Sequence, residues 1–159
     1  MMIIDGKKEA EILRQEIKKE IVSLKSKNNK VPGLTVILIG DFAPSQIYVK
    51  NKEKSAKEVG INSNVVRYSK EVTEEEVLKK IEDLNNDTDV SGILVQLPLP
   101  PQINKEKIIN AVSPKKDVDG FHPMNVGNLS SGYHALVPCT PLGCLYLIKK
   151  VEKNLSGKH

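Results

Sequence analysis

The sequence predicts an α/β fold, a three-layer domain in which helices flank a mainly parallel sheet. Short apolar runs rich in β-branched residues alternate along the chain with longer segments of helical periodicity. This alternation is typical of parallel sheets joined by helical crossovers. One run, residues 34–39 (LTVILI), is continuously apolar and lies between Gly33 and Gly40. That pattern favours a strand buried on both faces of the sheet.

The amino-terminal half is expected to contain two helices besides this strand, and then a second strand. Asp5 can cap a first helix that ends near Lys27, before the breaking sequence SKNNKVPG. Apolar residues recur along it at helical spacing: Ala10, Leu13, Ile17, Ile21 and Leu24. A second helix is predicted over residues 43–60, since Gly60 is suited to a left-handed stop. Residues 61–68 alternate loosely and predict a strand.

The carboxyl-terminal half is expected to add one strand and three helices. Thr73 and Glu76 have the spacing of a capping box, which predicts a helix to about residue 85. A third strand is predicted over residues 90–97, because Pro98 cannot extend a central strand. A short helix is expected over 105–111.

A loop-rich stretch follows, and the last helix is expected after it. Thr140 has the residue type of an N-cap, and Pro141 suits the first helical turn. This helix is predicted to end near Asn154. Residues 1–153 are therefore expected to form one domain, and residues 154–159 are expected to begin a connection to a further domain.

Composition excludes several classes of function. The chain has 159 residues, 39% of them hydrophobic, and a net charge of +4 that comes from lysine; Arg14 and Arg67 are the only arginines. Lysines interleaved with glutamates, without aromatic platforms, argue against a nucleic-acid binder. We find neither an apolar run of membrane-spanning length nor a secretory signal. Cys139 and Cys144 form neither a disulfide framework nor a zinc motif, which favours a cytoplasmic setting without a bound metal.

The helix predicted over 43–60 carries an unusual lysine. At about 100° per residue, Tyr48, Lys52, Ser55 and Val59 fall on one stripe, which is expected to pack inward. A lysine is rarely buried without a partner, so two interpretations of Lys52 stand side by side. Its stem can cover apolar surface while the amine reaches solvent. Alternatively, a lysine with a lowered pKa can move a proton at neutral pH.

Further candidates lie where the carboxyl ends of the predicted strands meet, which is where open parallel sheets bind ligands. Gln96 is a lone polar residue in an apolar strand, although an amide at a sheet edge is often bonded to backbone. Asp119 precedes a glycine, and Asp-Gly commonly forms a turn. His122 can be an ordinary loop residue. Lys116 and Asp117 are expected to be surface charges.

Four motifs in order resemble one enzyme family: SQIYVKNK at 45–52, VQLPLPP at 95–101, KDVDGFHP at 116–123 and PCTPLG at 138–143. They look like the bifunctional methylenetetrahydrofolate dehydrogenase/methenyltetrahydrofolate cyclohydrolase. The resemblance covers essentially the whole chain, as the amino-terminal catalytic domain of that family. Its second domain, a Rossmann domain that holds NADP, has no counterpart in this sequence, which lacks a glycine-rich dinucleotide fingerprint.

The resemblance implies roles for four residues. Tyr48 would stack on the folate near the reacting carbon. Lys52 would handle the proton of the water that attacks the methenyl bridge, and Gln96 would hydrogen-bond this lysine and help to keep it uncharged. Asp119 would bind the amino edge of the pterin.

The resemblance also implies a setting for the site. Val95 and Leu97 would line the folate slot, while Ser45 and Thr140 would lie where the cleft approaches NADP. The expected partner is a small-molecule folate, with no nucleic acid and no membrane. The full-length enzyme would be a cytoplasmic homodimer that serves purine biosynthesis. Two alternatives remain open: a folate-binding domain without activity of its own, and an α/β interaction domain.

Overall fold

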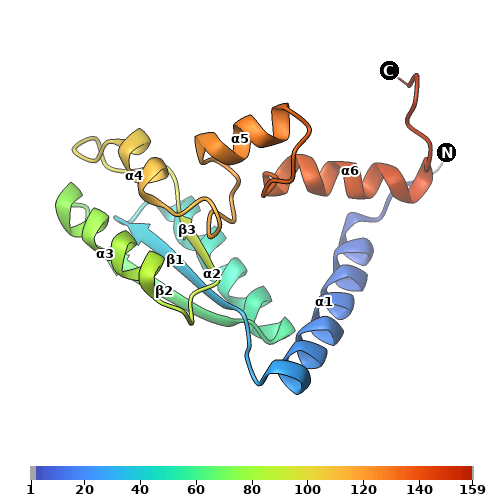
Figure 1. Ribbon diagram of the computed structural model, residues 1–159, viewed down its shortest axis with the longest axis horizontal. Coiled ribbons are helices and arrows are strands. Elements are labelled where there is room, and N and C mark those ends of the chain that lie inside the picture. The colour runs from blue at the N-terminus through green and yellow to red at the C-terminus, as the bar shows by residue number, and fades with distance from the viewer. Residues whose placement is uncertain (1–2, 159) are drawn as a thin grey trace.

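The computed structural model describes residues 3–158 (Figure 1). Three parallel strands form the sheet: β1 (Gly33–Ile39), β2 (Asn62–Tyr68) and β3 (Gly92–Val95), in the order β2-β1-β3. β1 is central, and one further parallel bridge joins Ile93 of β3 to the loop at residue 117. The predicted α/β fold with a parallel sheet is therefore confirmed.

Six helices surround or extend from this sheet within the described part of the chain. Their bounds are α1 (Gly6–Asn28), α2 (Ala43–Val59), α3 (Glu74–Asn86), α4 (Lys105–Ala111), α5 (Pro123–Ser130) and α6 (Cys139–Val151). The predicted capping box of α3 is present, with Thr73 and Glu76 bonded reciprocally. Gly60 ends α2 at φ 94°, as predicted. No helix among residues 3–158 is long and apolar enough to cross a membrane.

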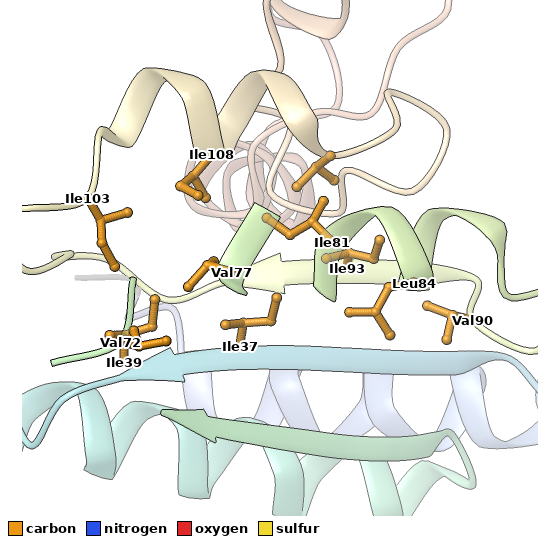
Figure 2. Packing of buried hydrophobic residues seen from close by; sticks show 11 residues of the cluster. Ile37, Ile39, Val72, Val77, Ile81, Leu84, Val90, Ile93, Ile103 and Ile108 are labelled. Atoms are coloured by element: carbon orange, nitrogen blue, oxygen red, sulfur yellow. The ribbon is translucent and has the colours of Figure 1, made fainter. Parts of the chain in front are cut away.

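One face of the sheet is closed by α3, α4 and the segments beside them. Figure 2 shows the side chains of this cluster gathered between β1 and the two helices. Its buried members are Ile37, Ile39, Val72, Val77, Ile81, Leu84, Val90, Ile93, Ile103, Ile108 and Val112. Burial of this much apolar surface is the main driving force for the fold.

The opposite face of the sheet is covered by α2 and is less completely filled. Its buried cluster consists of Val36, Leu38, Val49 and Leu94. Because successive residues of a strand point to opposite faces, β1 contributes Val36 and Leu38 here and Ile37 and Ile39 to the other side. The prediction of a strand buried on both faces is therefore confirmed.

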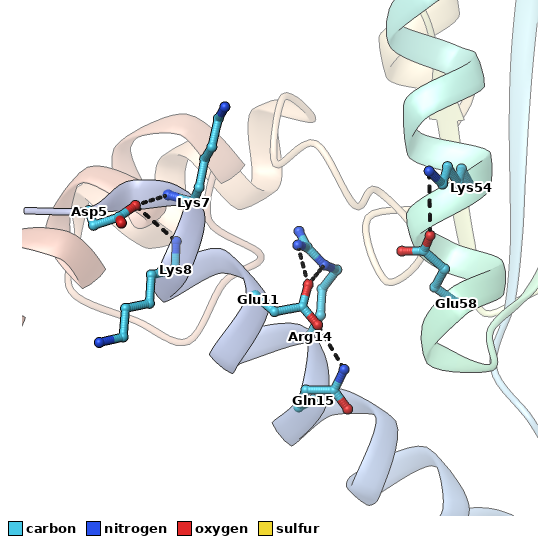
Figure 3. A network of polar contacts seen from close by, with 8 residues as sticks. All are labelled: Asp5, Lys7, Lys8, Glu11, Arg14, Gln15, Lys54 and Glu58. Carbon is cyan, nitrogen blue, oxygen red and sulfur yellow. Dashed lines mark hydrogen bonds and ion pairs between the residues drawn. The ribbon is translucent and has the colours of Figure 1, made fainter.

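Helix α1 extends away from the sheet in Figure 1 and is joined to α6 by the ion pair between Glu9 and Lys150 at 3.2 Å. Asp5 accepts hydrogen bonds from the backbone N–H groups of Lys7 and Lys8, both at 3.1 Å (Figure 3). Hydrogen bonds from Gln15 and Arg14 lower the pKa of Glu11. Ile21 is buried, whereas Leu24, which was expected on the inner stripe, is exposed.

The structure corrects the predicted bounds of two elements. β3 covers Gly92–Val95, so the predicted strand over 90–97 was two residues too long at each end. The Gln96 N–H nevertheless donates to the Ile37 carbonyl at 2.9 Å. α6 begins at Cys139 after Pro138 and has no side-chain cap, so Thr140 is not its N-cap. It ends at Val151, three residues before the predicted Asn154.

The structure also adds a helix that was not predicted. α5 lies in the stretch expected to be a loop. Its sequence, PMNVGNLS, contains glycine and asparagine and has no apolar periodicity. His122 caps it, because Nδ1 accepts the Met124 N–H at 3.1 Å.

Candidate functional site

Helix α2 delivers the lysine that the sequence singled out. The buried side of this helix consists of Ser45, Val49, Ala56 and Val59, and Lys52 is half-buried on the same side. The inward stripe predicted from helical spacing therefore differs from the observed one by a rotation about the axis of α2. Tyr48 was expected to face inward, but 63% of its surface is exposed.

Lys52 finds its partner at the end of β3. Its Nζ donates to Oε1 of Gln96 at 3.2 Å, and Nε2 of Gln96 donates to the carbonyl of Leu97 at 2.8 Å. The second bond orients the amide so that its oxygen faces the lysine. Gln96 thus offers Lys52 an acceptor without placing a negative charge beside it.

The segment after β3 is fixed to α2 by a second hydrogen bond. Ser45 is only 3% exposed, and its Oγ donates to the Leu97 carbonyl at 3.3 Å. The peptide bond between Leu97 and Pro98 is cis. Ser45 therefore faces the protein interior and braces the wall of the site, whereas Thr140 is exposed in the first turn of α6.

Asp119 is half-buried and lies beside Lys52 in the same groove. The next residue, Gly120, has φ 66°, and a Cβ there would lie 2.6 Å from the Leu136 carbonyl oxygen. Only glycine fits this turn without strain. Burial raises the pKa of the Asp119 carboxyl; the positive charge of Lys52 opposes the rise, and Asp117 adds to it.

Two hollows border Asp119. A groove of about 490 Å³ lies between α1, α2 and the open face of the sheet, with Lys52 and Asp119 among its lining residues. Its remaining walls are largely apolar and include Ile17, Leu34, Ala56, Val59 and Leu94. On the other side, a cavity of about 20 Å³ is lined by Val95, Leu97, Asp119 and Phe121 among others. A flat, largely apolar molecule with polar edges suits the walls of the groove of about 490 Å³.

Sequence reasoning missed the residues that shape the loop carrying Asp119. Asp117, expected at the surface, is only 6% exposed, and Asn125 of α5 is also buried. Lys116 is not a free surface charge either, because its Nζ donates to the carbonyls of Leu84 and Asp87 at 2.8 and 2.7 Å. The sequence shows only that Asp117 and Asn125 are eight residues apart, and neither this spacing nor the composition of the loop predicts that the two side chains are buried together.

Comparison with known proteins identifies the kind of domain. Residues 4–119 match the family described as tetrahydrofolate dehydrogenase/cyclohydrolase, catalytic domain. The bifunctional protein FolD of Pelagibacter ubique is 65% identical over 158 residues, which are 99% of this chain and 56% of that protein. The corresponding protein of Streptococcus pyogenes is 52% identical over 157 residues, 99% of this chain and 55% of its own length.

Solved structures show the same similarity. The bifunctional FolD enzyme of Campylobacter jejuni superposes with a TM-score of 0.94 at 46% identity, covering 98% of this chain and 55% of that one. The Trypanosoma brucei methylenetetrahydrofolate dehydrogenase-cyclohydrolase, solved with NADP and an inhibitor, gives 0.90 at 33% identity over 94% of this chain and 51% of that one. The chain spans about half the length of the curated relatives it matches.

Proposed function

This chain belongs to the tetrahydrofolate dehydrogenase/cyclohydrolase family, and we propose that its cleft binds a reduced folate and hydrolyses the 5,10-methenyl form to 10-formyltetrahydrofolate. The observation that carries the proposal is the 3.2 Å hydrogen bond between Lys52 and Gln96. It holds an amine at the edge of a groove that also contains a carboxylate, Asp119.

In this proposal, Lys52 handles the proton of the attacking water. Oxygen of water bonds to the methenyl carbon, and one water proton passes to Nζ and from there to solvent. The remaining hydroxyl proton is then transferred to N5 as the C=O bond forms. The carbon–N5 bond breaks with its electron pair going to N5, which leaves the formyl group on N10. The methenyl bridge is an iminium-type cation, so a neutral hydrogen-bond partner such as Gln96 suits the site. The amide orients the lysine and adds no charge that would hold the amine protonated.

Asp119 would bind the polar edge of the substrate, and Tyr48 would stack on one of its faces. An ionised carboxylate only accepts hydrogen bonds, which matches the N–H and amino donors at the edge of a pterin. The exposed ring of Tyr48 offers a stacking surface for the folate. Val95 and Leu97 would line the folate slot, as the resemblance implies, whereas the cavity of about 20 Å³ that they share with Asp119 has room for one water only.

The oxidation of 5,10-methylenetetrahydrofolate in the relatives' reaction needs NADP, which supplies the hydride chemistry when it is bound. The residues described here do not fit a dinucleotide. The sequence has no G-x-G-x-x-G motif, Ser45 is committed to Leu97, and Thr140 alone is no binding site. We propose that the oxidation belongs to a full-length protein of this family, and that this chain supplies its folate cleft.

The setting of the enzyme is part of the same proposal. A cytoplasmic protein that acts on a small-molecule folate, contributes to purine biosynthesis and forms a homodimer at full length is consistent with the family. The lysines interleaved with glutamates support a small-molecule partner over nucleic acid. Sedimentation of a full-length protein would test the homodimer, and a monomer would contradict it.

Two measurements on this chain test the function. A calorimetric titration with tetrahydrofolate should give saturable binding. Loss of the methenyl chromophore should show hydrolysis of 5,10-methenyltetrahydrofolate, and Lys52→Met should slow it by about a hundredfold or more. Lys50→Met is the matched control, because Lys50 lies on the same helix but is exposed.

The outcomes separate this proposal from its alternatives. Equal hydrolysis by wild type and Lys52→Met would show that Lys52 has no role in the reaction. Binding without hydrolysis by the wild-type chain would favour a folate-binding domain that is inactive alone. Absence of saturable binding would leave only an α/β interaction domain.

A further inference from the structure

Asp117 is a buried carboxylate that the proposed reaction does not use. Its Oδ2 accepts two hydrogen bonds, from the His122 N–H at 2.8 Å and from Nδ2 of Asn125 at 2.9 Å. Its own carbonyl accepts the Gly120 N–H at 3.2 Å. One residue therefore closes the turn that contains Asp119 from the inside.

Asn125 connects the turn to residues before and after it in the chain. Besides Asp117, its Nδ2 donates to the Pro114 carbonyl at 2.9 Å, and its Oδ1 accepts the Leu136 N–H at 3.4 Å. Asn125 is 5% exposed and is the one buried residue of α5. The unpredicted helix thus contributes an amide to the loop and little to the apolar core.

The loop is anchored to the sheet immediately before Asp119. The Ile93 N–H donates to the Lys116 carbonyl at 2.8 Å, and residue 117 forms the parallel bridge to β3. Asp119 follows two residues later, with Gly120 packed against Leu136 and Pro138 on its other side. The backbone of Asp119 is therefore held by β3 on one side and by residues 136–138 on the other. The hydrogen bonds of Asp117 lie between these two contacts.

We propose that the buried Asp117–Asn125 pair is the positioning device that fixes the Asp119 carboxylate at the mouth of the folate groove. The inference rests on the proposed function, since it assigns Asp119 a role in folate recognition. Asp117 touches no substrate in this scheme, because it acts through the loop that it closes.

Charge offers a readout that a purely structural role would not change. The groups that influence Asp119 are Lys52 from α2 and Asp117 from its own loop, while Arg14 and Cys139 line the same groove. Burial is the main cause of the raised pKa of Asp119, and the negative charge of Asp117 adds to it. Both side-chain bonds of Asp117 end on a single oxygen, so the amide oxygen of an asparagine can accept them too. Asp117→Asn should therefore keep the geometry and remove the charge.

The test is a double-mutant cycle on the dissociation constant for tetrahydrofolate, measured by calorimetry. Asp117→Ala should weaken binding about tenfold in the wild-type background and less than about twofold in the Asp119→Ala background, because the effect travels through Asp119. Equal effects in the two backgrounds would overturn the inference. Thr73→Ala is the matched control, since it breaks the cap of α3, which covers the opposite face of the sheet and does not line the groove, and it should leave the dissociation constant unchanged.

A second variant keeps the inference testable if Asp117→Ala does not fold. Asp117→Asn should bind tetrahydrofolate within about threefold of wild type, and the pH at which binding falls to half should move to a lower value. An unchanged midpoint for Asp117→Asn, or binding by this variant as weak as that expected of Asp117→Ala, would overturn the inference. Absence of tetrahydrofolate binding by the wild-type chain would overturn the proposed function and the inference together.

Discussion

The two faces of the sheet differ in how completely they are filled. On the α3/α4 face, eleven residues form a continuous buried cluster (Figure 2). On the α2 face, the buried cluster has four residues, and a groove of about 490 Å³ remains beside it. The groups proposed for chemistry, Lys52 and Gln96, belong to the face with the groove.

The difference also appears in the carboxylates. Glu74, beside the closed face, has a lowered pKa because Lys107 and the Asn104 N–H donate hydrogen bonds to it. Asp119, beside the groove, has a raised pKa because it is partly buried. The closed face is thus organised for stability, while the open face retains a charge that weakens the fold and suits ligand recognition.

The largest expected effect is on the open face and concerns activity. Lys52→Arg should not restore hydrolysis of 5,10-methenyltetrahydrofolate, and its rate should stay about a hundredfold or more below wild type. A guanidinium remains protonated at any working pH and cannot accept the proton of water. Turnover near the wild-type rate would show that positive charge, not proton transfer, is what the site requires.

Truncating an apolar side chain should lower the free energy of unfolding more on the closed face of the sheet than on the open face. Ile37→Ala, on the fully buried side of β1, should lower the free energy of unfolding by about 2–5 kcal/mol, because it leaves a cavity in a closed cluster. Leu34→Ala should cost less, since Leu34 already lines the open groove. Urea denaturation of both variants measures the difference. A greater loss for Leu34→Ala would contradict the comparison.

Asp119→Asn should stabilise the chain at neutral pH. Because folding raises the pKa of this carboxyl, the folded chain holds the proton more tightly than the unfolded chain does. Ionisation of the carboxyl as the pH rises therefore lowers the free energy of unfolding. The gain in melting temperature should be full above the raised pKa and should vanish as the pH falls to the ordinary value near 3.8. A stability difference independent of pH would argue against this origin.

Glu74→Gln should have the opposite sign and the smallest effect, because its ion-pair partner Lys107 is exposed to solvent. Its lowered pKa means that the ionised form stabilises the fold above the ordinary value of 4.5. The variant should melt below wild type at neutral pH, and the two should converge as the pH falls through the lowered pKa. Thermal melts at several pH values would reveal an absent or reversed trend.

Local patterns predicted the elements that are determined by local chemistry. The capping box at Thr73, the glycine stop at Gly60 and the apolar run of β1 each specify their structure through neighbours in sequence. The contact between Lys52 and Gln96 was anticipated only through the resemblance to the enzyme family, and the structure shows it as a 3.2 Å hydrogen bond.

The features that were missed depend on contacts between distant segments. The rotation of α2 about its axis, which exposes Tyr48, is set by packing against the sheet. Helical spacing alone does not fix this rotation, because the apolar stripe of a helix is broad. α5 forms around the Asn125 bonds to residues 114, 117 and 136. The burial of Asp117 follows from the same bonds, which no pattern within the loop encodes.

The most direct test of the central claim is a double-mutant cycle of Lys52→Met and Gln96→Leu on the rate of 5,10-methenyltetrahydrofolate hydrolysis. If Gln96 acts by holding the Lys52 amine, Gln96→Leu should slow the wild-type chain and leave Lys52→Met no slower than before. Independent, multiplicative losses would contradict the account, because they would mean that the 3.2 Å hydrogen bond does not couple the two side chains in the reaction.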